Sequence, residues 1–402
     1  MSDLLSVAAL VLSFSVIIVL VANRKNFGLA MLGGAFLLGL LSAPREVPRV
    51  LWETITDWRV ATLAVIVLLI KVLATVLQES GQIPLVIDHL KRVIPPRGML
   101  ATIPFIFGLL PIPGGALLSA PMVEVQGKKL QVTPEGRTFI NLWFRHIGFL
   151  VFPLSTALVV MSQVSEVHIN RLIALQTPIF LVTILVGLAY VIRLSSRAER
   201  EFVPPKNRST ILRETLVNIT PLLATIVLTF VLSTRMELNI AFLVALPTGI
   251  GLSLLLHRGR DAGGMLKRGL SPSLAVAVLG IMLYRNMAYA SGVTEAVAHY
   301  LQQASIPALL IIPLLSFAIG VLTAHNMAAI PLLYSMLAPM IDGDVALVSL
   351  LYISSFMGYL ISPLHLCVVV SYDYFKPHLG ALYKLMLPPA ALLTILAVLL
   401  AL

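Results

Sequence analysis

Three basic side chains lie inside long apolar stretches of the sequence. Lys71 is in the middle of VIVLLIKVLATVL, Arg145 is in NLWFRHIG, and Arg285 follows a third apolar run. A charge at the centre of a membrane helix costs about 2.5–3.5 kcal/mol on insertion scales, so such residues commonly bind substrates or couple ions. We expect this role for Lys71. For Arg145 and Arg285 the alternative is snorkelling, or an ion pair with Glu79 or Glu295.

Two histidines lie where apolar stretches of the second half are interrupted. His325 is in TAHNMAAIP, and His365 is in GYLISPLHL. An imidazole can be neutral or charged near neutral pH, and it can donate or accept a hydrogen bond. We therefore expect both histidines to contact a ligand or to relay protons.

Further candidate contacts lie where prolines and glycines break the apolar stretches. Non-helical backbone at membrane depth is tolerated only where it is buried in protein or faces an aqueous cavity. We predict substrate contacts at these breaks from Pro113, Gly114, Gly115, Ser119, Ser155, Thr156, Thr323, Asn326 and Ser362. Asn141 joins the three basic residues as a coupling candidate. The alternatives are a hydroxyl bonded to its own helix backbone, and a Gly-Gly pair that allows close helix packing.

The positive charge of the side chains that lie deep within the apolar stretches favours an anionic substrate. The carboxylates nearest to the apolar stretches, Glu79, Glu124, Glu295 and Asp373, lie towards their ends. A site for a multivalent cation would need inward carboxylates. The single cysteine, Cys367, excludes an intramolecular disulfide and predicts no cysteine-based metal site.

The sequence lacks the motifs of several classes of protein function. The sequence has no HExxH, no GxSxG and no Walker A motif, so zinc-protease, serine-hydrolase and ATP-driven chemistry are not indicated. We expect no enzyme activity, no metal and no cofactor, with Na⁺ considered only as a coupling ion. The net charge of +10 is attributed to basic cytoplasmic loops, and no nucleic-acid partner is expected.

The elements that must position these residues are membrane helices. With 58% hydrophobic and 11% charged residues, the chain is far from soluble-protein composition. Ten apolar runs match the length of a bilayer crossing, and we predict spans at 4–22, 27–43, 60–79, 138–163, 172–192, 214–233, 240–256, 272–290, 345–372 and 385–402. Two more stretches, about 98–123 and 305–338, are interrupted and are predicted to be re-entrant hairpins.

The predicted spans and hairpins divide the lysines and arginines of the loops unequally between the two sides of the membrane. They place 20 of the 28 lysines and arginines on one side and 5 on the other. The positive-inside rule makes the first side cytoplasmic and places both termini outside. The basic segment 194–213 is then a cytoplasmic linker.

A long-range repeat divides the chain. Residues 148–160 read GFLVFPLSTALVV, and residues 358–370 read GYLISPLHLCVVV, at an offset of 210. Each half, 1–193 and 214–402, then has five spans and one hairpin, with the broken helices at about 138–163 and 345–372. Because five is odd, the second half is inverted relative to the first, as in many secondary transporters. The predicted fold is all-α, polytopic, with two inverted-topology repeats.

The hairpin and broken-helix motifs resemble the ion-transporter superfamily of gluconate, dicarboxylate, citrate and arsenite permeases. LLPIPGGALLSAP before GFLVFPLST, and TAHNMAAIP before GYLISPLHL, look closest to an uncharacterised integral-membrane branch of it. The resemblance implies an elevator-like mechanism, with scaffold and transport domains, within a homodimer. The Ser-Asn-Thr hairpin tips of its sodium-coupled dicarboxylate members are absent, so sodium coupling and dicarboxylate specificity do not transfer.

The sequence therefore predicts a secondary transporter of a small anion, an organic acid, coupled to H⁺ or Na⁺. The alternatives are a proton-driven exporter of an amino acid or oxyanion, an anion channel and an intramembrane enzyme. The expected partners are the substrate, the coupling ion, membrane lipids and a second copy of the chain. The expected location is a cell membrane, taken to be a prokaryotic inner membrane.

Overall fold

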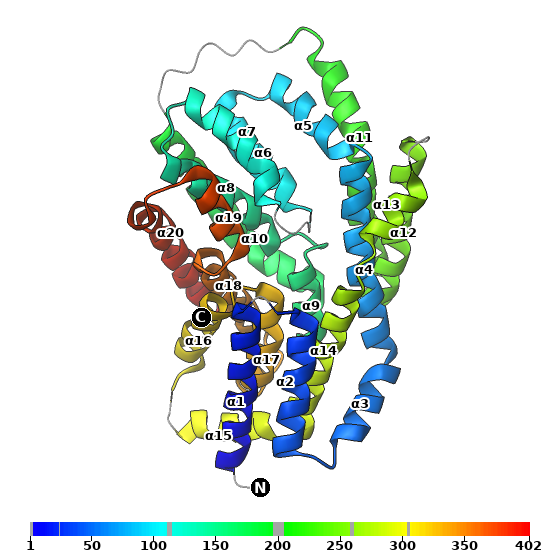
Figure 1. The fold of residues 1–402 in the computed structure, drawn as a ribbon, viewed down its shortest axis with the longest axis vertical. Helices are drawn as coiled ribbons and strands as arrows, with labels where there is room; N and C mark the ends of the chain where they lie inside the picture. The colour runs from blue at the N-terminus through cyan, green and yellow to red at the C-terminus, as the bar shows by residue number, and fades with distance from the viewer. Residues whose placement is uncertain (1–2, 24, 111–114, 196–204, 258–260, 304–305) are drawn as a thin grey trace.

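The structure is a computed structural model, and it describes all residues except 1–2, 24, 111–114, 196–204, 258–260 and 304–305 (Figure 1). The described residues form helices and no strands. The elements before the 196–204 gap are α1 (Asp3–Ala22), α2 (Phe27–Ser42), α3 (Val47–Thr56), α4 (Trp58–Glu79), α5 (Gln82–Val93), α6 (Pro96–Gly108), α7 (Ala116–Lys129), α8 (Pro134–Ile147), the 3₁₀ turn η1 (Gly148–Leu150), α9 (Thr156–Ser165) and α10 (Ile169–Leu194). Those after it are α11 (Arg208–Ser233), α12 (Leu238–Leu256), α13 (Ala262–Gly269), α14 (Pro272–Ala290), α15 (Val293–Gln303), α16 (Ala308–Thr323), α17 (Asn326–Ile341), α18 (Val345–Ile361), α19 (Leu366–Phe375) and α20 (Leu379–Leu400).

Many of these helices belong to segments that could span a membrane. Seven described segments are long and apolar enough to cross a bilayer: 58–79, 169–194, 208–233, 238–256, 262–290, 345–375 and 379–400. They coincide with seven of the ten predicted spans. The three other predicted spans overlap shorter apolar helices, 5–21, 27–42 and 156–165. The chain is an all-helical, multi-pass membrane protein.

Both predicted hairpins are pairs of packed helices. In the first, α6 lies against α7, and in the second, α16 lies against α17 (Figure 1). The second pair turns at Ala324, which adopts a left-handed backbone conformation with φ of 49°. That the hairpins enter and leave on one side of a membrane stays a prediction.

Both predicted broken helices are interrupted at the expected residues. α8 gives way to η1 and an irregular segment before α9 begins at Thr156, and α18 ends at Ile361, before α19 begins at Leu366. Pro153 and Pro363 lie within these breaks. A proline disfavours helical backbone at the residue before it and removes one N–H donor, so each proline favours the irregular backbone of its break.

Glycines bring the hairpins into backbone contact with the broken helices. A Cβ on Gly108 of α6 would overlap the carbonyl oxygen of Arg145 in α8. In the second half, a Cβ on Gly320 of α16 would overlap the carbonyl oxygen of Ser355, and one on Gly358 of α18 would overlap that of Phe317. Small residues at such crossings allow close helix approach within membranes.

The breaks are held deep in the protein because α8 and α18 form its interior. Every residue of α8 from Gly136 to Ile147 is buried, and so are nearly all residues of α18 from Val348 to Ile361. Around them, α2 packs on α1 and α14, while α12 packs on α4 and α11 (Figure 1).

Four short helices, α3, α5, α13 and α15, were not predicted from the sequence. Each has 8 to 12 residues, too few to cross a bilayer, and carries polar residues along one face. For example, α3 buries Val50 and exposes Arg49 and Glu53. α13 is tied to α4 by an ion pair of 2.7 Å between Arg268 and Glu79.

Candidate functional site

A cavity of about 310 Å³ lies where the helix breaks meet the turn between α16 and α17. Its described walls come from α4, the end of α6, α8, α9, α14, α17, α18 and α19. They consist mostly of aliphatic and aromatic side chains, including Phe149, Phe152 and Tyr359. This composition is typical of small-molecule sites, where a few polar groups fix the orientation of the ligand.

Seven of the residues predicted from the sequence line this cavity: Lys71, Arg145, Ser155, Thr156, His325, Asn326 and His365. They come from four places in the fold that are far apart along the chain. The structure therefore brings together most of the predicted intramembrane cations, both predicted histidines and one side of each helix break.

Two other predicted residues, Ser119 and Asn141, lie outside the cavity lining and are joined by a hydrogen bond. The Ser119 hydroxyl donates to Asn141 Oδ1 at 2.6 Å, and Asn141 Nδ2 donates to the Ala116 carbonyl and to Ser371 Oγ, both at 3.2 Å. Ser119, Asn141 and Ser371 are all fully buried. Asn141 thus links α7, α8 and α19. This is the structural role that the sequence left open as an alternative to a role in transport.

Thr323 and Ser362 also use their hydroxyls for hydrogen bonds to backbone carbonyls. The Thr323 hydroxyl donates to the Ile319 carbonyl of its own helix at 2.8 Å. The Ser362 hydroxyl donates to the Val321 carbonyl at 2.6 Å and so ties the α18–α19 break to α16. Neither side chain lines the cavity.

Arg285 lies outside the cavity, in an ion pair. Its guanidinium is 2.9 Å from the carboxylate of Glu166, the residue after α9, and lies 5.3 Å from the ring centre of Tyr289. The sequence offered Glu79 or Glu295 as partners. Instead, Glu79 pairs with Arg268, and Glu295 accepts a hydrogen bond from Thr294 at 2.7 Å.

At the tip of the first hairpin, Pro113 and Gly114 lie outside the described residues. Gly115 is described, and its backbone lies against the Arg145 guanidinium so closely that a Cβ would overlap Nη2. The missing side chain at Gly115 therefore provides the room that the guanidinium occupies.

Four helices begin at or beside the cavity without a capping side chain. The residue before the first turn is Gly115 for α7, Ser155 for α9, His325 for α17 and His365 for α19, and none of these side chains caps its helix. The first N–H groups of a helix have no partner within the helix, and its N-terminal end carries a partial positive charge. Convergent N-termini of this kind suit an anion.

Three side chains in the wall carry polar atoms that are buried and have no hydrogen-bond partner. These atoms are His325 Nδ1, both amide atoms of Asn326, and both ring nitrogens of His365. Asn326 is 5% exposed and His365 is 2% exposed. Because a buried polar atom without a partner costs about 1–3 kcal/mol, such a cluster is expected to meet a ligand or water.

The charges in the wall have one sign. Among the described lining residues the ionised groups are Lys71 and Arg145, and none is a carboxylate. Arg145 is 4% exposed, whereas Lys71 is partly buried. A wall of this sign is matched by a negatively charged ligand.

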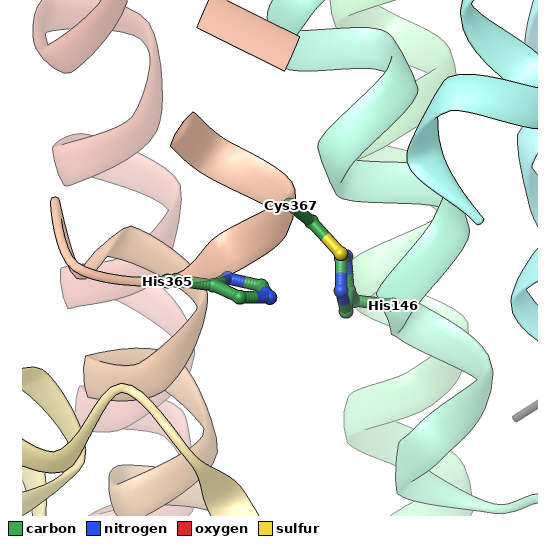
Figure 2. Close-up of side chains that lie close together, drawn as sticks. All are labelled: His146, His365 and Cys367. Atoms are coloured by element: carbon green, nitrogen blue, oxygen red, sulfur yellow. The ribbon is translucent and has the colours of Figure 1, made fainter. Parts of the chain in front are cut away.

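Sequence reasoning missed a second group in the wall, formed by His146, Tyr359 and Cys367. The His146 ring lies 4.8 Å from the His365 ring, and the Tyr359 ring lies 4.0 Å from it, between ring centres. Figure 2 shows Cys367 and the two histidines directed toward one another from α8 and from the start of α19. A signal was available for two of them, since the 210-residue offset aligns Phe149 with Tyr359 and Ala157 with Cys367.

Comparisons with known proteins place this fold in a family. The family described as "Protein of unknown function (DUF401)" matches residues 6–402. No match is found among curated proteins. A crystal structure of the YdaH transporter of Alcanivorax borkumensis, described as having an unusual topology, is similar with a TM-score of 0.60 and 15% identity. The similarity covers 96% of this chain and 98% of that one. The fold is thus one that a membrane transporter adopts, and the chain belongs to the DUF401 family.

Proposed function

We propose that the protein is a secondary transporter of a small anion, with the cavity as its substrate site. The observation that carries the proposal is the wall itself: two basic side chains, no carboxylate among the described lining residues, and the uncapped N-termini of α9, α17 and α19. Charge-assisted hydrogen bonds from such groups are about twice as strong as neutral ones. They would offset the cost of removing an anion from water.

The polar contacts suit a small organic acid. Arg145 and the N-termini of α9 and α17 offer donors for a carboxylate, and the aromatic rings of Phe149 and Tyr359 can cover a carbon skeleton. The same donors could bind an oxyanion or the carboxylate of an amino acid, which is the alternative substrate class for a proton-driven exporter.

Alternating access would come from two inverted repeats. The elements α1–α10 and α11–α20 follow one another in the same order, each half ending in hairpin, broken helix and long helix. Left-handed residues recur at an offset of 210 or 211: Gly81 with Gly292, Gln131 with Asp342, and Glu166 with Lys376. Gly108 against Arg145 also corresponds to Gly320 against Ser355. These correspondences support the repeat, and the odd number of predicted spans per half supports its inversion.

In this proposal the hairpins, the broken helices, α10 and α20 move as one unit against a scaffold of the remaining helices. The backbone contacts of α6 with α8, and of α16 with α18, support rigid movement of each half of that unit. His325, at the second hairpin tip, stacks on Phe27 of α2 with ring centres 4.7 Å apart. This contact lies between the two proposed units and would have to break as they move. The homodimer and the cell-membrane location belong to the same proposal.

Coupling to protons would use the cavity histidines. His325 and His365 lie at the starts of α17 and α19, with ring nitrogens that have no partner in the described structure. Each can accept a proton when the adjacent anion supplies a negative charge. Na⁺ is the alternative coupling ion, held by carbonyl groups at the breaks.

A ligand screen tests the charge argument. Purified protein should gain thermal stability from at least one carboxylate, amino acid or oxyanion, because a ligand at about 100 times its Kd adds roughly 2.7 kcal/mol. In Lys71→Gln the same anion should stabilise less at equal concentration, since one positive charge is lost from the wall. Stabilisation by divalent cations, with no response to any anion, would contradict the proposal. The screen is run at two pH values to detect coupled protonation.

A second prediction concerns Gly115. In Gly115→Ala the new methyl group would occupy the place of the Arg145 guanidinium, which lies at the end of a flexible side chain and can move. The fold should persist while anion binding weakens roughly tenfold, as expected when a well-aligned charge-assisted contact is lost. Titration calorimetry with the stabilising anion measures this change. Gly251→Ala is the matched control, because nothing lies within 4 Å of its Cβ. Equal affinities for both variants would remove Arg145 from the site.

A further inference from the structure

Two histidines and the only cysteine of the chain form a cluster in one wall of the cavity. One ligand atom from each of His146, His365 and Cys367 lies within 4.8 Å of the others. His146 comes from α8, while His365 precedes α19 and Cys367 lies in its first turn (Figure 2). Imidazole nitrogen and cysteine sulfur are the ligands that soft transition-metal ions prefer.

The hydrogen bonding of the histidines leaves nitrogens available. His146 Nδ1 donates to the Leu142 carbonyl at 2.7 Å, which leaves Nε2 with its lone pair. Such a bond from the second nitrogen is the usual way in which a protein orients a metal-binding histidine. Both nitrogens of His365 are buried without a partner, and His365 is 2% exposed.

The surrounding charges restrict which ion fits. Arg145 interacts with the Cys367 side chain, and Lys71 lies in the same cavity. A thiolate cancels the charge of a monovalent ion, whereas a divalent ion would leave a positive charge beside two cations. Low coordination by two nitrogens and one sulfur also suits Cu⁺.

We propose that His146, His365 and Cys367 bind one thiophilic monovalent cation, for which Cu⁺ is the best match. On binding, a bond forms between the metal and Cys367 Sγ, the S–H bond breaks, and the thiol proton passes to water. The oxidation state of the metal does not change. The ligands would close in from their present spacing, which the first turn of α19, next to the break after Ile361, can accommodate.

The test uses the purified full chain under anaerobic conditions, with Cu⁺ supplied from its bicinchoninate complex. We expect one Cu⁺ per chain and release of one proton. Cys367→Ser and His365→Gln should each weaken binding by at least about 100-fold, because each removes a ligand rather than an outer contact. His168→Asn is the control: His168 caps α10 through its Nδ1, and asparagine is among the preferred capping residues. It should bind Cu⁺ like the unchanged protein.

Three outcomes would overturn the proposal. They are binding of Cu⁺ by Cys367→Ser as tightly as by the unchanged protein, absence of any stoichiometric binding, and tighter binding of Zn²⁺ than of Cu⁺. A melting curve of each variant shows that it is folded, so lost binding is not mistaken for lost structure. The measurement involves no transport, so its result is independent of the proposed anion function.

Discussion

Replacing Arg145 by glutamine is expected to abolish saturable anion uptake by the reconstituted protein. Arg145 is 4% exposed, lines the cavity and lies against the start of α7. Removing one partner of a buried charge pair costs about 2–5 kcal/mol, and 3 kcal/mol corresponds to roughly 100-fold in affinity. The loss should appear both as absent uptake and as absent stabilisation by the anion.

Two variants make this result specific. Arg285→Gln also removes a membrane arginine, but that side chain pairs with Glu166 outside the cavity, so uptake should persist. Arg145→Lys keeps the charge without the planar fork and should retain only part of the affinity. If Arg145→Gln is folded and transports normally, Arg145 is a structural residue and the anion site must lie elsewhere.

The second large effect is expected from Gly358→Ala, this time on stability. The new Cβ would overlap the carbonyl oxygen of Phe317, and backbone cannot move aside as a side chain end can. Overpacking of this kind costs about 1–3 kcal/mol and forces α16 and α18 apart. The apparent Tm should fall by several degrees, as measured by fluorescence-detected unfolding in detergent.

Gly251→Ala is the comparison for that result. It also places alanine within a membrane helix, but its Cβ has no neighbour within 4 Å. Alanine has a higher helix propensity than glycine, so this variant should be as stable as the unchanged protein or slightly more so. A Tm for Gly358→Ala equal to that of Gly251→Ala would mean that α16 and α18 are not in backbone contact.

The long apolar helices could be predicted from sequence because their length and composition suffice to identify them. The breaks at Pro153 and Pro363 could be predicted because the same proline-containing motif recurs in both halves, whereas a single proline does not suffice: Pro104 and Pro178 lie inside continuous helices. The short helices α3, α5, α13 and α15 could not, because each is too short for an apolar run to identify it. Their formation depends on packing against helices that are distant in sequence.

For the candidate site, the most informative sequence signal was the free-energy cost of placing a charged side chain inside a membrane helix. Lys71 and Arg145 reached the cavity, as costly intramembrane charges often do. Arg285 carried the same signal, but its partner Glu166 lies 119 positions away, beyond the reach of local reasoning. The roles of hydroxyls such as Ser119 and Ser362 could not be predicted from sequence. A hydroxyl can donate a hydrogen bond to a ligand or to a nearby protein oxygen, and the sequence does not distinguish the two.

The group around Cys367 shows a different limit. His146 was visible as a histidine next to Arg145, and Cys367 as a lone cysteine, but nothing local joins them. They meet because α19 packs on α8, a contact between residues more than 200 positions apart. Only the tertiary fold turns three separate residues into one cluster.

The single sulfur would also report on the proposed transport cycle of the protein. Because Cys367 is the only cysteine in 402 residues and lies in the cavity wall, a thiol reagent modifies one place in the molecule. A conformation that opens the cavity to one side of the membrane exposes that sulfur to that side alone. The rate at which a membrane-impermeant reagent reacts from either side of a vesicle would then measure how the protein divides its time between the two proposed orientations, without an introduced labelling site.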